Sequence, residues 1–330
     1  MNHGIKNSVV AGVGSYVPEM VLDNQKLSQK VETSDEWIRT RTGITERRIA
    51  SNEQTTSDLA FFAAQRAIES AKIDPGQIDL VIVATITPDM AFPSTACLLQ
   101  HKLGLGKVAC FDLEAACSGF LYALDVADGM LASGRYKCVL VIGAEKMSSI
   151  LDWEDRTTCV LFGDGAGAAI LRVEGDGPQL LGFCSGADGS NPSLLHQPAG
   201  GSKSPASIST IENREHFLKM NGKEIFKYAV RVMEKATREL LAANGFDAKD
   251  VQHVIPHQAN MRIVESMANR LEIPLERFYC NLDRHGNTSA ASIPIALDEA
   301  CKKEIFNKGD LAVMVAFGAG LTWSATLVRF

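Results

Sequence analysis

Three side chains of this sequence have the types needed for thiol chemistry: Cys117, His257 and Asn287. Cys117 stands in EAACSGFLYALD, where small flanking residues leave the sulfur approachable and a helical pattern begins. A helix N-terminus or a nearby imidazole lowers the pKa of a thiol from its free value of about 8.5. The sequence therefore predicts a nucleophilic cysteine at position 117. The alternative is a buried structural thiol.

The two other side chains also have structural alternatives. His257 precedes polar residues at the end of a strand-like segment, which favours a functional role. His253 and His285 lack that setting, so we interpret them as structural. Asn287 in HGNTSA could serve as a turn or helix-cap residue.

The segments around these residues alternate between strand and helix patterns. LVIVAT (80–85) and KCVLVIG (137–143) are apolar, β-branched runs typical of buried parallel strands, and residues 159–162 read as another strand. Residues 57–72 have the apolar spacing of a helix. The pattern predicts an α/β protein with a mostly parallel core sheet.

A weak internal repeat relates the two halves of the chain. IDPGQIDLVIVAT, which contains Ile82, resembles FDAKDVQHVIPHQ, which contains Ile255, at an offset of 173 residues. The tripeptide ALD at 123–125 recurs at 296–298 with the same offset of 173. A third match, FGDGAGAAILRV with FGAGLTWSATLV, has an offset of 155. Two similar α/β halves are therefore expected.

We divide the chain into an N-terminal half, residues 1–175, and a C-terminal half, residues 176–330. The first half carries the cysteine, and the second carries the histidine and the asparagine. Between them, residues 185–214 form a Gly/Ser/Pro-rich loop, which we expect to cover or shape a pocket.

The repeat predicts that the three chemical residues meet. The counterpart of Cys117 is Ala290, so Asn287 also lies close to a helix start. His257 directly follows HVIP, the counterpart of the end of LVIVAT. Ligands of α/β sheets bind beyond the carboxyl ends of strands. Packing the halves about a pseudo-twofold axis would therefore assemble a Cys-His-Asn cluster.

Composition excludes several classes of protein. The chain has 330 residues, 46% of them hydrophobic, and a net charge of −6, which disfavours disorder and general nucleic-acid binding. No apolar run approaches the ~20 residues of a membrane span. The N-terminus has no secretory-signal pattern. None of the eight cysteines forms a CxxC pair or has metal-ligand spacing, so no metal and a reducing, cytoplasmic setting are expected.

FGDGAG at 162–167 is not a dinucleotide-binding motif. Its glycines are spaced G-x-G-x-G, and AAILRV after them reads as a strand rather than a helix. FGAG at 317–320 could present backbone N–H groups to an anionic oxygen.

Six motifs in order resemble β-ketoacyl-acyl-carrier-protein synthase III, the condensing enzyme that initiates type II fatty-acid synthesis. They are TSDEWIRTRTGITERRI (33–49), AACSGF (115–120), FGDGAGAA (162–169), PHQAN-x-RI (256–263), DRHGNTSAAS (283–292) and AFGAGLTW (316–323). The resemblance implies a thiolase fold, with two duplicated βαβαβαβ halves forming a layered α/β/α/β/α core.

The resemblance also implies catalytic roles. Cys117 would accept an acyl group, acetyl in the simplest case, from coenzyme A. His257 and Asn287 would bind the thioester oxygen of malonyl-carrier protein as it loses CO₂. The resulting enolate would attack the Cys117 thioester to give a 3-oxoacyl-carrier protein. Backbone N–H groups of Cys117 and Ala319 would form the oxyanion hole. Acyl-CoA is then a substrate, and no cofactor is required.

Binding roles follow from the same resemblance. Trp37 and Arg156 would sandwich the adenine of coenzyme A, and Arg41 would hold its nucleotide end. Phe92 would reach across a homodimer interface to close the partner's acyl pocket. The residues expected to receive the acidic carrier protein are Gln258, Ala259, Asn260, Met261, Arg262, Lys227 and Arg270.

Four other functions remain to be weighed against this one. A specialised condensing or acyl-transferring paralogue of secondary metabolism would keep many of the same motifs. A degradative thiolase would need a second catalytic cysteine, where this chain has FGAGL. A cysteine hydrolase would also use Cys, His and Asn, but its local cysteine signature is absent. A non-catalytic carrier-binding module would not need all three residues.

Overall fold

Nine strands form the central sheet of the computed structural model, which describes residues 8–330. The N-terminal half contributes five strands in the order β5-β4-β6-β7-β1, and the C-terminal half four in the order β11-β12-β13-β8. The strands are β1 (Val9–Tyr16), β4 (Leu80–Ala84), β5 (Ala109–Leu113), β6 (Cys138–Glu145), β7 (Gly165–Arg172), β8 (Gln179–Ala187), β11 (His253–Pro256), β12 (Leu311–Gly318) and β13 (Thr322–Arg329). β1 and β8 pair only at Val9 and Gln179, so the halves separate into two packed layers.

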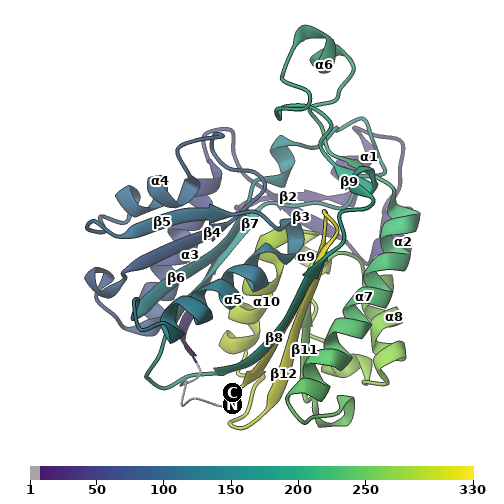
Figure 1. Cartoon of the computed structure of the whole chain (residues 1–330). Coiled ribbons are helices and arrows are strands. Elements are labelled where there is room, and N and C mark those ends of the chain that lie inside the picture. Colours follow the sequence, from purple (N-terminus) through teal and green to yellow (C-terminus); the bar gives the residue numbers. More distant parts are fainter. Residues whose placement is uncertain (1–7) are drawn as a thin grey trace.

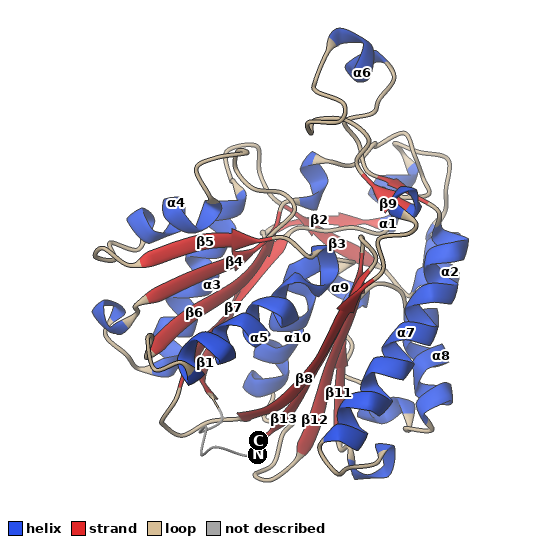
Figure 2. Cartoon of the chain, in the orientation of Figure 1, coloured by secondary structure: helices blue, strands red, loops and turns tan. Residues whose placement is uncertain are grey.

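Helices fill and cover these layers in the predicted α/β/α/β/α order (Figure 2). α5 (Gly119–Ala132) and α10 (Ser292–Lys302) lie between the two halves of the sheet. α3 (Thr56–Ala71) and α4 (Thr95–Lys102) cover the outer face of the first half. α7 (Gly222–Ala243) and α8 (Met261–Leu271) cover that of the second.

Shorter elements complete the described chain. They are β2 (Met20–Asp23), β3 (Glu46–Ile49), β9 (Leu195–His196), β10 (Lys219–Met220), α1 (Asn24–Ser28), α2 (Asp35–Thr42), α6 (Ile208–Glu212) and α9 (Leu282–His285), with 3₁₀ turns η1 (Pro75–Gln77), η2 (Ala116–Ser118), η3 (Met147–Ser149), η4 (Pro192–Leu194), η5 (Ala248–Asp250), η6 (Leu275–Arg277) and η7 (Ser289–Ala291). Within residues 8–330, the structure has no helix that is both long and apolar enough to span a membrane.

The central helix layer packs closely because glycines stand beneath it. A Cβ at Gly143 of β6 would lie 2.3 Å from the carbonyl oxygen of Ala290, and one at Gly167 of β7 would lie 2.6 Å from Cβ of Pro294. Both separations are far below ordinary contact. These two glycines therefore allow the start of α10 to rest directly on the strands of the other half.

The structure extends the internal repeat. The offset of 173 relates the starts of β4 and β11, of η2 and η7, of α5 and α10, and of β6 and β12. β7 and β13 are related by 157 residues, so the expected offset of 155 is wrong by two. The reason is that FGDG lies before β7, whereas the first two residues of FGAG are the last two residues of β12. Residues 159–161 form a turn rather than the expected strand, and Phe162 forms an isolated bridge with Asn287.

The Gly/Ser/Pro-rich segment has defined structure. After β8 it continues through β9 into a projecting arm, residues 197–217, that carries α6 (Figure 1). At the base of the arm, Arg214 Nε donates to Asp152 at 2.9 Å, and Lys219 Nζ lies 3.7 Å from the same carboxylate. The first residues of the arm line a cavity described below.

Candidate active site

Cys117, His257 and Asn287 meet at the lining of one small cavity, of about 120 Å³, between the two halves. Cys117 also lines a larger cavity of about 890 Å³. The thiol therefore stands where two spaces adjoin. The cluster expected from the repeat is confirmed as a geometric feature.

Cys117 lies in η2, immediately before α5, and is buried. Its neighbour Ala116 has a φ of +47°, a conformation rare for residues with a side chain, which marks a tight turn at the nucleophile. Burial raises the pKa of the Cys117 thiol to about 12, partly offset by a hydrogen bond with the Ser289 side chain. Desolvation of the thiol thus opposes the lowering of its pKa that is expected from its position before α5.

His257 follows β11 and is also buried. Its backbone N–H donates to the carbonyl of Val315, and its Nδ1 lies 2.6 Å from Ser292 Oγ. Burial lowers the pKa of His257 to about 4, so the imidazole is neutral at pH 7. Such a ring supplies a hydrogen bond rather than a charge.

Asn287 is fixed through both its backbone and its side chain. Its N–H donates to Leu161 at 2.8 Å, and its carbonyl accepts from Gly163 at 3.0 Å. Its Oδ1 accepts the backbone N–H of Ser289 at 2.9 Å. Because the oxygen is occupied, the amide NH₂ remains as the group that can donate to a ligand.

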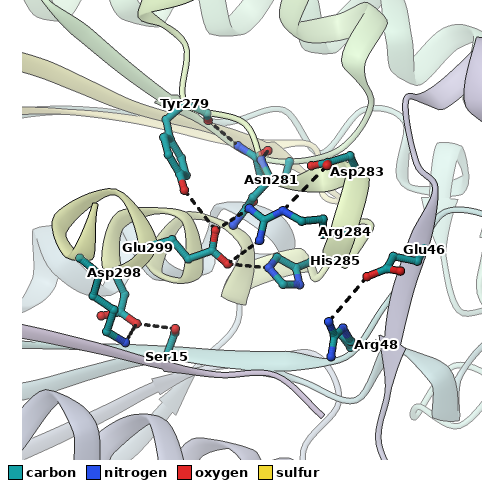
Figure 3. Close-up of polar contacts among 12 residues, drawn as sticks. Ser15, Glu46, Arg48, Tyr279, Asn281, Asp283, Arg284, His285, Asp298 and Glu299 are labelled. Carbon is teal, nitrogen blue, oxygen red and sulfur yellow. Dashed lines mark hydrogen bonds and ion pairs between the residues drawn. The ribbon is translucent and has the colours of Figure 1, made fainter. Parts of the chain in front are cut away.

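A partly buried polar network lies beside the segment that carries Asn287 (Figure 3). Glu299 of α10 accepts from Arg284 Nη2 at 2.8 Å, from Tyr279 Oη at 3.1 Å, and lies 2.6 Å from His285 Nε2. Although burial opposes ionisation, these hydrogen bonds hold the pKa of Glu299 well below its usual range. His285 is thus structural, as is His253, which lies 2.9 Å from Asp310.

The turn after β12 closes on the nucleophile. Gly318 approaches so closely that a Cβ there would lie 2.7 Å from the backbone nitrogen of Cys117. Thr322 Oγ1 donates to the carbonyls of Ala115 at 2.8 Å and Ala319 at 3.0 Å. Ala319 and Cys117 both line the larger cavity.

The three residues expected to hold coenzyme A also come together. The guanidinium carbons of Arg41 and Arg156 lie 5.0 and 5.4 Å from the centre of the Trp37 ring. Arg41 and Arg156 are exposed. Asn260 Nδ2 donates to the carbonyl of Arg41 at 3.1 Å, which links this cluster to the small cavity that Asn260 lines.

The residues expected at a carrier-protein surface divide into two groups. Gln258 is 1% exposed, and its side chain hydrogen-bonds to Pro256, Tyr279 and Asn281, so placing it at that surface is a mistake. Ala259, Asn260 and Met261, which follow Gln258 in the chain, belong to the same group and are partly buried.

The exposed group consists of three cations on α7 and α8: Lys227, Arg262 and Arg270. Lys227 pairs with Glu224 at 2.8 Å, and Arg270 with Glu234 at 2.5 Å. The guanidinium of Arg262 lies over the Phe226 ring. Phe226 lines the small cavity, so Arg262 stands beside its wall.

Phe92 is 84% exposed although it lines the larger cavity. Met90, two residues before it, is also exposed, and apolar side chains exposed together are typical of an interaction surface. Ile86, Met147 and Leu195 contribute apolar wall to the same cavity.

Sequence reasoning missed Ser289 and Ser292, which contact the side chains or backbone of the predicted residues. The repeat contained a signal for Ser289, because its counterpart is Ala116, the neighbour of Cys117. The structure gives both residues φ values near +50°. Glu145 was also missed: it lies two residues beyond the strand predicted at 137–143, but it ends the observed strand β6 as the counterpart of Gly318.

Comparisons with known proteins agree with this geometry. Residues 111–189 match the family model of 3-oxoacyl-[acyl-carrier-protein] synthase III, and residues 241–330 match its C-terminal model. The β-ketoacyl-[acyl-carrier-protein] synthase III of Caldanaerobacter subterraneus subsp. tengcongensis is 53% identical, over 97% of each chain. The chain belongs to the β-ketoacyl-acyl-carrier-protein synthase III family.

Solved structures of the synthase III family share the fold. The 3-oxoacyl-[acyl-carrier-protein] synthase III from Aquifex aeolicus VF5 is 49% identical in sequence. The match covers 98% of this chain and 100% of that one, with a TM-score of 0.90. The priming β-ketosynthase of the R1128 polyketide pathway is 36% identical, covers 98% and 96%, and also has a TM-score of 0.90. The protein is accordingly a condensing acyltransferase of fatty-acid synthesis, and the hydrolase and thiolase alternatives are wrong.

Proposed function

We propose that this enzyme transfers an acyl group from coenzyme A to Cys117 and condenses it with malonyl-acyl-carrier protein. The products are free CoA, CO₂ and a 3-oxoacyl-carrier protein. The convergence of Cys117, His257 and Asn287 on one cavity, within a chain of this family, carries the proposal. All proposed steps use side chains and backbone groups of the protein, without a metal or redox cofactor.

In the first half-reaction, the Cys117 sulfur attacks the thioester carbonyl of acyl-CoA. Negative charge develops on the carbonyl oxygen, and the backbone N–H groups of Cys117 and Ala319 stabilise it. One such donor contributes about 10²–10³ in rate. Trp37, Arg41 and Arg156 bind the nucleotide end, where an aromatic ring and two guanidinium groups suit a flat base with phosphates.

In the second half-reaction, malonyl-carrier protein loses CO₂ and becomes an enolate. Ser292 engages His257 Nδ1, and we assign the ring proton to Nε2. His257 Nε2 and Asn287 Nδ2 then donate to the thioester oxygen on which the enolate charge develops. A neutral imidazole with its proton on Nε2 suits this step, because Nε2 can donate to the oxygen while Nδ1 accepts from the Ser292 hydroxyl.

The enzyme also binds the carrier protein and a second copy of itself. The acidic carrier protein docks on Arg262, Lys227 and Arg270, beside the wall of the small cavity. The acyl chain enters the larger cavity, which Phe92 of a second copy closes in a homodimer. The enzyme works in the cytoplasm. Acetyl is the simplest primer, and the cavity of about 890 Å³ has room for branched or longer chains.

The similarity to the R1128 priming β-ketosynthase supports a second candidate function, that of a priming enzyme of secondary metabolism. Identity of 53% to a fatty-acid family member against 36% to that enzyme favours fatty-acid synthesis.

Intact-protein mass spectrometry with acetyl-CoA and several branched or longer acyl-CoAs tests the proposal. We expect a mass gain of one acyl group, lost in Cys117→Ala and retained in Cys110→Ala. Adding malonyl-acyl-carrier protein should remove that mass and give 3-oxoacyl-carrier protein. An adduct that persists in Cys117→Ala, or an acyl-enzyme that does not react with malonyl-acyl-carrier protein, would contradict the proposal.

A further inference from the structure

Arg47 of β3 is a fully buried guanidinium that lies outside the catalytic cavities. Each of its hydrogen bonds in the described structure goes to an uncharged oxygen. Nη1 donates to the carbonyl of Leu22 at 3.1 Å and to Asn24 Oδ1 at 2.8 Å, and Nη2 donates to the carbonyl of Val160 at 2.7 Å. Because a guanidinium is a rigid planar fork, three acceptors on it are fixed relative to one another.

These acceptors come from two distant parts of the chain. Leu22 lies in β2 and Asn24 begins α1, whereas Val160 follows Arg47 by 113 residues. Burial lowers the pKa of Arg47 to about 10, so the group keeps all its donors at pH 7. Arg47 therefore fastens the β2–α1 corner to the segment around Val160.

Asn24 extends this connection to α2. While its Oδ1 accepts from Arg47, its Nδ2 donates to Asp35 Oδ1 and to the carbonyl of Ile44, both at 2.9 Å. Asp35 is the first residue of α2, and Ile44 stands two residues after its end. Both amide protons and the amide oxygen are thus in use, which holds this buried side chain in one orientation.

The Val160 end of the connection reaches Arg156. A run of turns, residues 156–161, carries both residues, and within it the carbonyl of Asp155 accepts two backbone N–H groups at 3.0 and 3.1 Å. Arg156 Nη1 donates to the carbonyl of Glu32 at 3.0 Å. The hydrogen bond from Arg47 to Val160 therefore restrains the backbone from which the Arg156 side chain extends.

Arg47 thus stands between the two parts of the Trp37 cluster. Trp37 and Arg41 are on α2, whereas Arg156 is on the turn, and both guanidinium carbons lie 5.0–5.4 Å from the centre of the ring. A flat base contacts the ring and a guanidinium together only if their relative position is well held. A gap of about 0.5–1 Å already forfeits a quarter to a half of a dispersion contact.

We propose that Arg47 is a positioning residue for acyl-CoA. Through its hydrogen bonds it fixes α2 against the turn at 156–161, and this sets the position of Trp37 relative to Arg156. Arg47 lines neither of the two cavities that Cys117 lines, so it acts on binding rather than on the reacting atoms. The inference rests on the proposed function, which assigns the nucleotide end of acyl-CoA to this cluster.

The same turn also supports Asn287, which offers a rival role for Arg47. The Asn287 N–H donates to the carbonyl of Leu161, and its own carbonyl accepts from Gly163. The two half-reactions separate these roles, because acyl-CoA carries an adenine nucleotide and malonyl-carrier protein does not. A role in nucleotide binding affects acylation alone, whereas support of Asn287 affects condensation.

Arg47→Lys in the full-length enzyme tests the proposal, because a single ammonium keeps the charge but does not span three acceptors. Quenched-flow acylation over a range of acetyl-CoA concentrations gives the half-saturating concentration and the maximal rate. We expect the half-saturating concentration to rise about fivefold, with the maximal rate within twofold of the unmodified one. Condensation of the purified acyl-enzyme with malonyl-carrier protein should stay within twofold.

A second variant breaks the connection without touching the buried cation. Asp35→Ala removes the contact of Asn24 with α2 and should raise the half-saturating acetyl-CoA concentration about threefold. Glu36→Ala is the matched control, since it removes an exposed carboxylate from the same helical turn and should change neither half-reaction. In a Trp37→Ala background, Arg47→Lys should add less than twofold, because its effect passes through the ring.

The proposal is overturned if folded Arg47→Lys has an unchanged half-saturating acetyl-CoA concentration. It is also overturned if condensation slows as much as acylation, a result that would assign the residue to the support of Asn287. If Arg47→Lys does not fold, Asp35→Ala compared with Glu36→Ala decides by the same two criteria. An unmodified enzyme that forms no acyl-enzyme would instead refute the proposed function.

Discussion

Replacing Gly318 with alanine perturbs the nucleophile through a single methyl group. The new Cβ would lie 2.7 Å from the backbone nitrogen of Cys117 and 3.2 Å from that of Ser118, whereas ordinary contact begins at 3.4 Å. The nucleophile turn must therefore retreat by about 0.7 Å. An oxyanion donor acts within about 2.7–3.1 Å of its acceptor, so a shift of this size removes most of the hydrogen bond.

The expected result is an acylation rate lowered by about 10²–10³, which corresponds to about 3–4 kcal/mol of transition-state stabilisation. Single-turnover release of CoA measures this rate directly. The KM for acyl-CoA should change little, because the Trp37 cluster on α2 is remote in the chain from this turn. Both half-reactions should slow, since in each a negative charge develops on the oxygen of the acyl group that is bonded to the Cys117 sulfur.

Gly129→Ala is the matched control. Gly129 lies in α5, the helix that follows Cys117, and a Cβ there meets nothing within 4 Å. This variant should acylate normally and gain up to about 1 kcal/mol in stability from helix propensity. A folded Gly318→Ala enzyme that acylates at the unmodified rate would refute the assignment of the Cys117 N–H to the oxyanion hole.

Three further predictions concern binding and stability. Trp37→Ala should raise the KM for acyl-CoA roughly tenfold with kcat unchanged, because the ring contacts no reacting atom; steady-state kinetics would contradict this if kcat fell instead. Glu299→Ala should lower the free energy of unfolding by about 3 kcal/mol in urea, because buried His285 loses its partner; a change below 1 kcal/mol would show that the network is dispensable. Hydrogen bonding from Arg214 lowers the pKa of Asp152 to about 2, so the stabilisation of the arm by this carboxylate is present above pH 4 and lost as pH falls toward 2. Asp152→Asn should therefore speed amide exchange in the arm at pH 7, and unchanged exchange would exclude this anchor.

Cys117, His257 and Asn287 could be predicted because each lies at the end of a helix or strand that the sequence pattern indicates. Cys117 begins a helix, and His257 ends a strand. Asn287 precedes the helix related to that of Cys117 by the repeat. These rules depend on local pattern and on one offset, both visible in a single sequence.

The supporting residues could not be predicted in the same way. Glu145 and Ser289 come from different halves and meet only because Gly143 allows η7 to approach β6. Gln258 is polar in type, yet the turn after β11 directs its amide inward to buried carbonyls. The pKa of Cys117 depends on how much water the assembled halves exclude, and local sequence does not determine that.

The central helix layer has a consequence for synthesis on the ribosome. α5 and α10 share one hydrophobic cluster, but α10 begins 173 residues after α5. At about 5–20 residues per second, translation leaves α5 without that cover for roughly 9–35 s. Phe120 and Leu124 are fully buried in the folded protein. During that interval they can form non-native hydrophobic contacts with other chains. A nascent chain stalled before residue 292 should therefore aggregate or recruit a chaperone, whereas the released full-length chain should not.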